Sequence, residues 1–155
     1  MIENKWSLII IDDAPNFLQG KSLCEILKLL STTAKFNFVV WNHIDGSGAD
    51  WLISALQIQS NKIMKIDEFL KIISDIKQID WGDFFLFKDY PNFWRNPKGE
   101  LYPYVIAQPE TTVRAVDNQY FYIYTRYQEV VNVIQNHYKI ESIKIGSLEE
   151  LDYPE

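Results

Sequence analysis

Two stretches of the sequence hold side chains whose types and spacing could do chemistry. Asp12 and Asp13 are adjacent carboxylates that directly follow a short apolar run, and carboxylate oxygens suit a hard cation such as Mg²⁺. His43 and Asp45 could act as a general base and the carboxylate that orients it. Cys24 offers this pair no nucleophile, because it lies in the middle of an amphipathic pattern rather than at a helix N-terminus, where its pKa would be lowered. The sequence therefore predicts no catalytic site, and we expect Cys24 to be a core or boundary residue.

The acidic pair also carries a resemblance to a known family. The stretch Leu8–Leu30, an apolar run followed by two carboxylates and an amphipathic helix pattern, resembles the start of response-regulator receiver domains. That resemblance implies a magnesium site beside a phosphorylatable Asp on the third strand of a parallel sheet. The chain departs from it, because the strand pattern at 36–43 ends in Asn-His and the one at 62–66 is followed only by Asp67, a good helix N-cap. A receiver-like or magnesium-dependent signalling or hydrolytic domain is therefore the alternative hypothesis, and a solvated turn is the simpler interpretation of the pair.

Acidic and aromatic side chains form a second constellation. Asp80-Trp81-Gly82-Asp83 and the Pro- and Asn-rich stretch at 89–99 are predicted to lie in and beside a loop, where binding residues concentrate. Carboxylates speed the encounter with a basic protein, and Trp and Tyr rings supply buried contact area. The alternative is that the rings are core and that the C-terminal acids form a solvated chain end. The residues that we expect to contact a partner are Asp83, Asp89, Tyr90, Trp94, Tyr120, Tyr122, Tyr124, Glu149, Glu150 and Asp152.

Composition limits the kinds of protein that this chain can be. Its 155 residues predict one domain, and 47% hydrophobic with 23% charged residues is typical of a folded globular protein. No apolar run approaches the ~20 residues of a membrane-spanning helix and no signal-peptide pattern is present, so we expect a cytoplasmic protein without a membrane partner. One cysteine and two histidines exclude an intramolecular disulfide and a Cys/His zinc site, and we expect no cofactor. The balance of 15 basic and 21 acidic residues, a net charge of −6, disfavours a nucleic-acid partner and favours a basic one.

Hydrophobic periodicity predicts the elements that must position these residues. Helices are predicted over residues 22–30, 51–60, 68–77 and 127–138, the third with Asp67 as its N-cap. For the second, a hairpin that turns near Ser60-Asn61 is the alternative. Strands are predicted over residues 6–11, 36–43, 62–66, 84–87, 101–107, 112–116, 120–125 and 140–145. Every residue of the strand at 84–87 is apolar, so this strand should be covered on both faces. Pro103 indicates that the strand at 101–107 lies at an edge of the sheet near its start. The stretch Asp45-Gly46-Ser47-Gly48 is predicted to be a turn.

The Asp117-Asn118-Gln119 stretch predicts a hairpin whose loop length decides which side chains share a face. A one-residue slip would mix apolar and polar side chains, so we expect a three-residue loop, with Gln119 in a left-handed last position. The apolar face would then hold Val113, Ala115, Phe121 and Ile123. The opposite face would hold Thr112, Arg114, Tyr120, Tyr122 and Tyr124.

The order of these elements predicts an α+β fold, with a single domain over residues 1–155 and an acidic tail over 147–155. We expect a mixed or mainly antiparallel sheet with about three helices packed on it and an α/β-like N-terminal third.

A small, acidic, aromatic-rich domain without a catalytic constellation resembles the immunity proteins that neutralise polymorphic or contact-dependent growth inhibition toxins in bacteria. The resemblance is one of overall character. It implies a non-enzymatic binding protein that occludes the active site of a toxin, often a basic nuclease.

Overall fold

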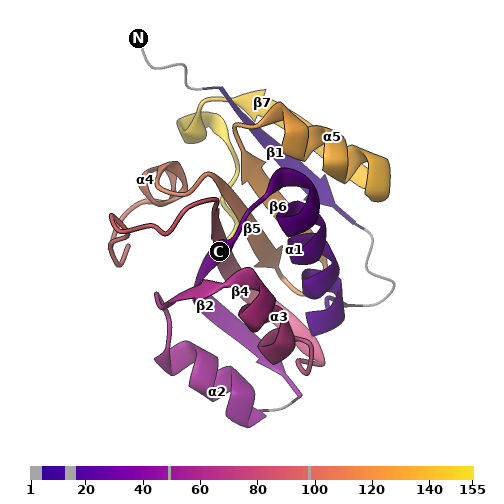
Figure 1. Cartoon of the computed structure of the whole chain (residues 1–155). Coiled ribbons are helices and arrows are strands. Elements are labelled where there is room, and N and C mark those ends of the chain that lie inside the picture. The colour runs from indigo at the N-terminus through magenta and orange to yellow at the C-terminus, as the bar shows by residue number, and fades with distance from the viewer. Residues whose placement is uncertain (1–4, 13–16, 49, 98) are drawn as a thin grey trace.

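A seven-stranded antiparallel sheet runs through the whole molecule in the order β3-β2-β4-β5-β6-β1-β7 (Figure 1). The computed structural model describes residues 5–12, 17–48, 50–97 and 99–155. Its strands are β1 (Trp6–Ile11), β2 (Phe38–Ser47), β3 (Ile63–Lys65), β4 (Gln78–Phe87), β5 (Thr111–Val116), β6 (Tyr120–Thr125) and β7 (Ile140–Gly146). Its helices are α1 (Gly20–Ala34), α2 (Asp50–Ile58), α3 (Ile66–Ile73), α4 (Tyr102–Ala107), α5 (Gln128–His137) and the short 3-10 helix η1 (Leu148–Glu150). The predicted α+β fold with a mainly antiparallel sheet is therefore confirmed.

The strand-helix-strand order at the N-terminus does not form a parallel βαβ unit. β1 pairs with β6 and β7, whereas β2 pairs with β3 and β4, so β4, β5 and β6 lie between β1 and β2. All of the described strand pairs are antiparallel. The described part of the chain therefore lacks the doubly wound parallel sheet that the receiver resemblance implies, and that expectation is wrong for the fold.

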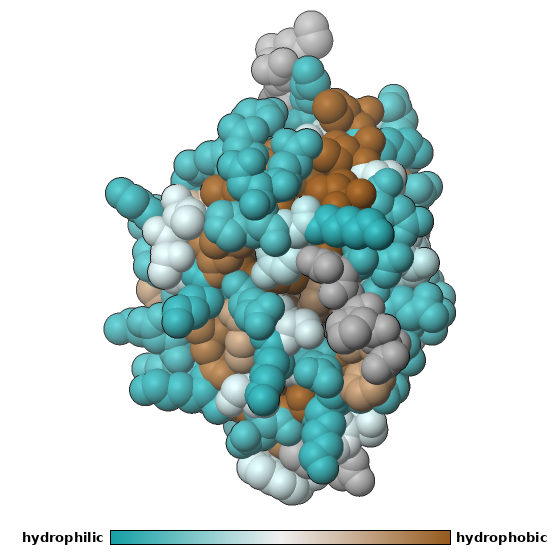
Figure 2. All heavy atoms as spheres, turned by 90° about the vertical axis from the view of Figure 1, so that its right-hand side faces the viewer, coloured by the Kyte–Doolittle hydropathy of each residue, from teal (hydrophilic) through white to brown (hydrophobic). Residues whose placement is uncertain are grey.

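Four helices cover one face of the sheet and form the larger of two cores. The apolar residues of α1 follow the predicted helical spacing, and Leu23, Ile26, Leu27 and Leu30 are all buried. Helices α2, α3 and α5 contribute buried residues to the same core. Figure 2 shows the side of the molecule on which α1 and α5 lie, where hydrophilic residues cover most of the surface. Among the helices that the structure describes, none is both long and apolar enough to span a membrane.

The opposite face of the sheet carries a smaller core, which α4, the segment before it and the C-terminal residues cover. β4 serves both cores, because Phe84 and Leu86 point into the larger one and Phe85 and Phe87 into the smaller one. The prediction that this strand is covered on both faces is thus confirmed. Val105 on α4 is one of the residues that close the smaller core.

Two predictions about element type and boundary are wrong. The stretch predicted as a strand at 101–107 is the helix α4, in which Pro103 lies in the first turn. Proline is tolerated there because the N–H groups of a first turn have no acceptor inside the helix. Helix α3 begins at Ile66, so Asp67 lies in its first turn instead of capping it, a place where the helix dipole favours a carboxylate.

β2 and β4 are both longer than predicted. β2 continues through Asp45, Gly46 and Ser47, because a β-bulge lets pairing with β4 resume there, and the predicted turn is wrong. β4 begins at Gln78, so Asp83 lies inside a central strand rather than in or beside a loop. The two extensions bring polar residues of β2 and β4 together on the sheet.

The β5–β6 hairpin has the predicted three-residue loop. Val116 pairs with Tyr120, and the four apolar residues predicted to share a face all lie in the larger core. The left-handed conformation falls on Asp117 and Asn118, each with a φ of 50°, and not on Gln119. Aspartate and asparagine adopt this conformation more readily than other residues with a side chain, so the loop uses the residues best suited to it.

The C-terminal residues fold back on the smaller core instead of forming a solvated tail. Leu148 and Leu151 are buried there. The ring of Tyr153 stacks on those of Tyr102 and Tyr124, with centroid distances of 5.7 and 5.2 Å. The apolar residues of this segment are therefore part of the fold, while its acidic side chains stay exposed.

Candidate functional site

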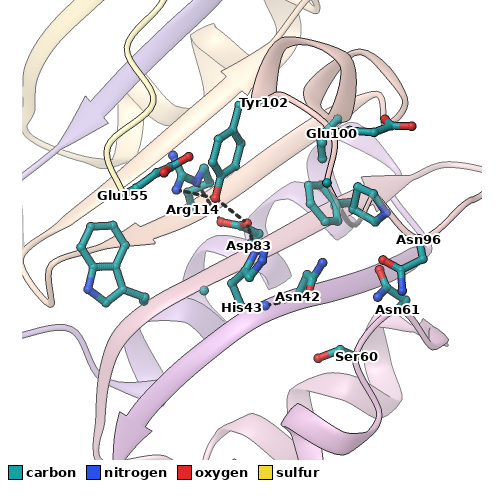
Figure 3. Close-up of a pocket in the computed structure, with 16 residues that line it drawn as sticks. Asn42, His43, Ser60, Asn61, Asp83, Asn96, Glu100, Tyr102, Arg114 and Glu155 are labelled. Atoms are coloured by element: carbon teal, nitrogen blue, oxygen red, sulfur yellow. Dashed lines mark hydrogen bonds and ion pairs between the residues drawn. The ribbon is translucent and has the colours of Figure 1, made fainter.

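A pocket of about 650 Å³ opens on the sheet face opposite the four-helix layer (Figure 3). β2 and β4 contribute its central residues. β5, α4, the segment before α4, the turn after α2 and the C-terminus contribute the others. Its polar lining side chains include Asn42, His43, Asn61, Asp83, Glu100 and Arg114.

His43 and Asp83 form a hydrogen-bonded pair inside this pocket. Nδ1 of His43 lies 2.9 Å from Oδ2 of Asp83, and the imidazole is 64% exposed while the carboxylate is 3% exposed. The bulge in β2 makes the contact possible, because it shifts the register between Asn42 and Asp45 and turns His43, with a φ of 53°, to the face that carries Asp83. The pair of His43 and Asp45 that the sequence allowed is not formed: His43 contacts Asp83 instead, and the Asp45 carboxylate accepts a hydrogen bond from the N–H of Gly46.

Two further donors hold the Asp83 carboxylate. Nε of Arg114, directly across from Asp83 on β5, donates to Oδ1 over 2.8 Å, and the Tyr102 hydroxyl donates to Oδ2 over 3.2 Å. Nη2 of Arg114 donates to the Tyr102 hydroxyl over 3.0 Å and to the backbone oxygen of Pro154 over 2.7 Å. The guanidinium also lies over the Tyr102 ring, 4.2 Å from its centroid. A buried ion pair thus joins β4, β5, α4 and the C-terminal residues.

This network shifts the pKa values of Asp83, His43 and Tyr102. Burial alone raises the pKa of Asp83, but the hydrogen bond from His43 and the charge of Arg114 outweigh burial and hold that pKa below its ordinary value. The hydrogen bond to Asp83 raises the pKa of His43, and burial raises the pKa of Tyr102 to about 12. At neutral pH Asp83 is therefore a carboxylate and Tyr102 a neutral phenol. The Nδ1–H of His43 is directed at Asp83, which leaves Nε2 for a ligand.

An imidazole oriented by a buried carboxylate can accept a proton at Nε2 or donate one from it. Within the part of the chain that the structure describes, no Ser, Thr or Cys side chain is hydrogen-bonded to His43. Cys24 packs against the larger core on the other face of the sheet, where its thiol donates to the backbone oxygen of Leu70 over 3.5 Å and burial raises its pKa to about 11. The interpretation of Cys24 as a boundary residue is confirmed. The pocket is equipped to bind polar groups by hydrogen bonds.

The ten residues predicted to contact a partner fall into three groups. Asp83 and Tyr124 are buried, which corrects their assignment to an accessible surface: Asp83 is held by its ion pair, and the Tyr124 hydroxyl donates to the backbone oxygen of Asp152. Partly buried are Trp94, Tyr120 and Tyr122. Exposed are Asp89, Tyr90, Glu149, Glu150 and Asp152.

Large apolar side chains are exposed along the segment that leads from β4 to α4 and on α4 itself. Tyr90 is 54%, Phe93 60%, Leu101 70% and Tyr104 66% exposed, and we call these four residues the apolar band. The rings of Tyr90 and Phe93 each pack edge-on against a phenylalanine of the smaller core side, so their positions are held. Sequence patterning misses Leu101 and Tyr104, because it predicts a strand where the structure has α4.

Sequence reasoning also misses Arg114 and Tyr102 as members of the site. One signal could have found Arg114: a guanidinium inside a central strand must be neutralised if it is buried, which demands a carboxylate on a neighbouring strand. Asp83 meets that demand only once β4 is recognised to begin at Gln78. Tyr102 had no such signal, because its position depends on α4.

The structure describes only one of the two aspartates on which the magnesium hypothesis rests. Asp12 is exposed after the end of β1, and Asp13 lies outside the described residues. Over the described ranges, no three His, Cys, Asp or Glu side chains gather where they could hold a metal ion. Magnesium binding at this pair stays a prediction.

Comparison of the chain with protein-family models, with curated proteins and with solved structures finds no match. A fold by itself does not imply a function. The geometry of the pocket and of the apolar band therefore carries the functional proposal.

Proposed function

We propose that this protein is a non-catalytic immunity protein, which binds a cognate basic toxin domain in the bacterial cytoplasm and neutralises it by occluding its active site. The observation that carries the proposal is the apolar band, in which four large apolar side chains are exposed along one segment. Exposed apolar patches mark protein interfaces, because monomeric proteins rarely leave such patches uncovered. Aromatic residues such as Tyr are enriched among the side chains that contribute most to binding.

Backbone hydrogen bonds hold the described residues around the apolar band. The backbone N–H of Trp94 donates to Pro91 O over 3.1 Å, and that of Tyr104 donates to Leu101 O over 3.0 Å. The indole of Trp94 packs against Phe85 of β4, with ring centroids 4.9 Å apart. Association costs least when the contact residues are already ordered, so this segment is suited to tight binding.

Acidic groups accompany the apolar band and fit a basic partner. Asp89 and Glu100 are exposed directly beside Tyr90 and Leu101 in the sequence. Helix η1 packs against α4 and carries two further exposed carboxylates. Together with the net charge of −6, these groups favour association with a positively charged surface.

Affinity capture tests the proposal. The immobilised protein is exposed to a lysate of its native host, and retained proteins are identified by mass spectrometry. We expect one basic protein to be retained. Phe93→Ala with Tyr104→Ala should lose that protein, whereas the matched variant Trp51→Ala with Ile58→Ala, which truncates two exposed apolar side chains of α2, should keep it.

The captured protein must then behave as a toxin. Its expression should arrest growth, and co-expression of the present chain should restore growth while the Phe93→Ala, Tyr104→Ala variant should not. If the captured protein is harmless, or if both double variants retain it equally, the immunity function is wrong.

A further inference from the structure

We propose that the pocket beside His43 receives an arginine side chain of the protein partner. This inference rests on the proposed function and adds the group by which the partner is recognised. The pocket and the apolar band share a segment, because Asn96, Glu100 and Tyr102 line the pocket while Phe93 and Leu101 belong to the band. A partner that lies on the band therefore has the pocket within reach of its side chains.

The charges of the described lining residues favour a cation. Asp83 and Arg114 neutralise each other through their buried ion pair. Glu100 and Glu155 are exposed lining residues without such a partner among the described ion pairs, and Figure 3 shows them on two sides of the pocket. The described lining thus carries an excess of negative charge whether His43 is neutral or protonated, since the two glutamates outnumber the one imidazole. A guanidinium that enters it gains attraction from both glutamates.

Hydrogen-bond acceptors in the pocket also fit a donor-rich ligand. Oδ1 of Asn61 is buried and has no hydrogen-bond partner among the described residues, and Asn61 lines the pocket. Such an unpaired acceptor is satisfied when a ligand brings a donor. Above its raised pKa, His43 is neutral and its Nε2 is a second acceptor, because Nδ1 is engaged with Asp83.

A buried donor without a partner is also present, so an anion is the competing occupant. In the part of the chain that the structure describes, Nη1 of Arg114 meets no hydrogen-bond acceptor. An anion bound there is repelled by the carboxylates of Glu100 and Glu155, which line the same pocket. The negative charges of Glu100 and Glu155 therefore favour a cation over an anion in the pocket.

Arginine suits the pocket better than lysine does. Its guanidinium presents five N–H donors in a planar fork, which can reach a carboxylate and an amide oxygen at once. It also stacks on aromatic rings, and Trp81 supplies such a ring in the lining. A volume of about 650 Å³ holds a guanidinium with its methylene stem and leaves room for water.

Titration with N-acetyl-L-arginine methylamide tests the inference on the full chain. The imidazole signals of His43 and the indole N–H signal of Trp81 are followed by NMR, and Trp81→Phe assigns the indole. We expect both signals to shift in a saturable way. Glu100→Gln with Glu155→Gln should weaken the apparent affinity about fivefold, because each exposed charge contributes modestly. The matched variant Glu25→Gln with Glu68→Gln, on the helical face, should change it by less than about twofold.

Two results would overturn the inference. A response to inorganic phosphate but not to the arginine compound would make the pocket an anion site built on Arg114 and His43. No response to either compound would make the network a purely structural one. Neither result touches the proposed function, which fails only if the captured partner is harmless or does not depend on the apolar band.

Discussion

Asp83 is the residue on which the polar contacts of the site converge, and its ion pair with Arg114 is almost fully buried. Removing one member of such a pair leaves an uncompensated charge in a medium of low polarity. Removing both members leaves none. The two cases should therefore have different effects on the free energy of unfolding.

We expect Arg114→Met alone to lower the free energy of unfolding by about 3 kcal/mol, because Asp83 then stays buried without its main counter-charge. Asp83→Leu alone should cost a similar amount. The double variant should lose less than either single variant. Urea unfolding of the four proteins measures this, and a double variant that loses the sum of the single effects would contradict the coupling.

The His43–Asp83 contact should make stability depend on pH. The hydrogen bond to Asp83 raises the pKa of His43 above its ordinary value of 6.5, with smaller effects of burial and of the charges of Asp83, Arg114 and Glu155. The folded state therefore holds the imidazole proton more tightly than the unfolded chain does. This stabilisation is fully present below about pH 6.5 and disappears as the pH rises through the folded-state pKa.

His43→Asn isolates this effect, because asparagine tolerates the φ of 53° at this position. The difference in unfolding free energy between the natural protein and the variant should be larger at about pH 5.5 than at about pH 9. Both conditions lie above the ordinary pKa of 3.8 for Asp83, whose lowered pKa stabilises the fold until the pH falls through its folded-state value. A difference that does not change with pH would mean that His43 binds its proton equally in both states.

At the scale of elements, the sequence predicts best where one periodicity dominates. The apolar stripe of α1 and the segregated faces of the β5–β6 hairpin follow from side-chain spacing alone, and the structure confirms both. α4 could not be predicted in the same way, because it is six residues long and only Val105 and Ile106 are buried. Its position depends on the smaller core beneath it, whose residues come from segments far apart in the sequence.

The pocket could not be predicted for a related reason. The bulge at His43 interrupts the alternation of side chains along β2, and no pattern in the sequence predicts this bulge. Without the bulge, regular alternation would direct His43 to the face opposite Asp83. The sequence contains His43, Asp83 and Arg114, but the register of the strands decides which of these side chains meet.

The loop of the β5–β6 hairpin allows an element-scale test of which residues hold the left-handed conformation. Asp117 has a φ of 50°, so Asp117→Val should lower the free energy of unfolding by about 1–2 kcal/mol, because a β-branched side chain clashes with the backbone there. Asp117→Gly should be nearly neutral. Gln119 has no positive φ, so Gln119→Val is the matched control and should have a small effect. Thermal or urea unfolding compares the three, and a larger loss from Gln119→Val would place the strained position at Gln119.

At the scale of the whole molecule, exposed acidic residues lie both on the side of the apolar band and on the side of the helices. The net charge of −6 acts on any approaching partner, but acids near the contact surface act most strongly, since salt screens charges beyond about 8–10 Å at physiological ionic strength. Position and total charge can therefore be separated experimentally. Two variants with equal net charge but different charge placement make the comparison.

The first variant neutralises exposed acids on the band side, Asp89→Asn, Glu149→Gln, Glu150→Gln and Asp152→Asn. The second neutralises the same number on the helical side, Glu25→Gln, Asp67→Asn, Glu68→Gln and Asp75→Asn. With the captured partner in stopped flow, the first should slow association about tenfold at low salt and flatten its salt dependence, while dissociation changes little. The second should leave the salt dependence close to that of the natural protein. If both variants slow association equally, only net charge matters and the partner is not steered to the apolar band.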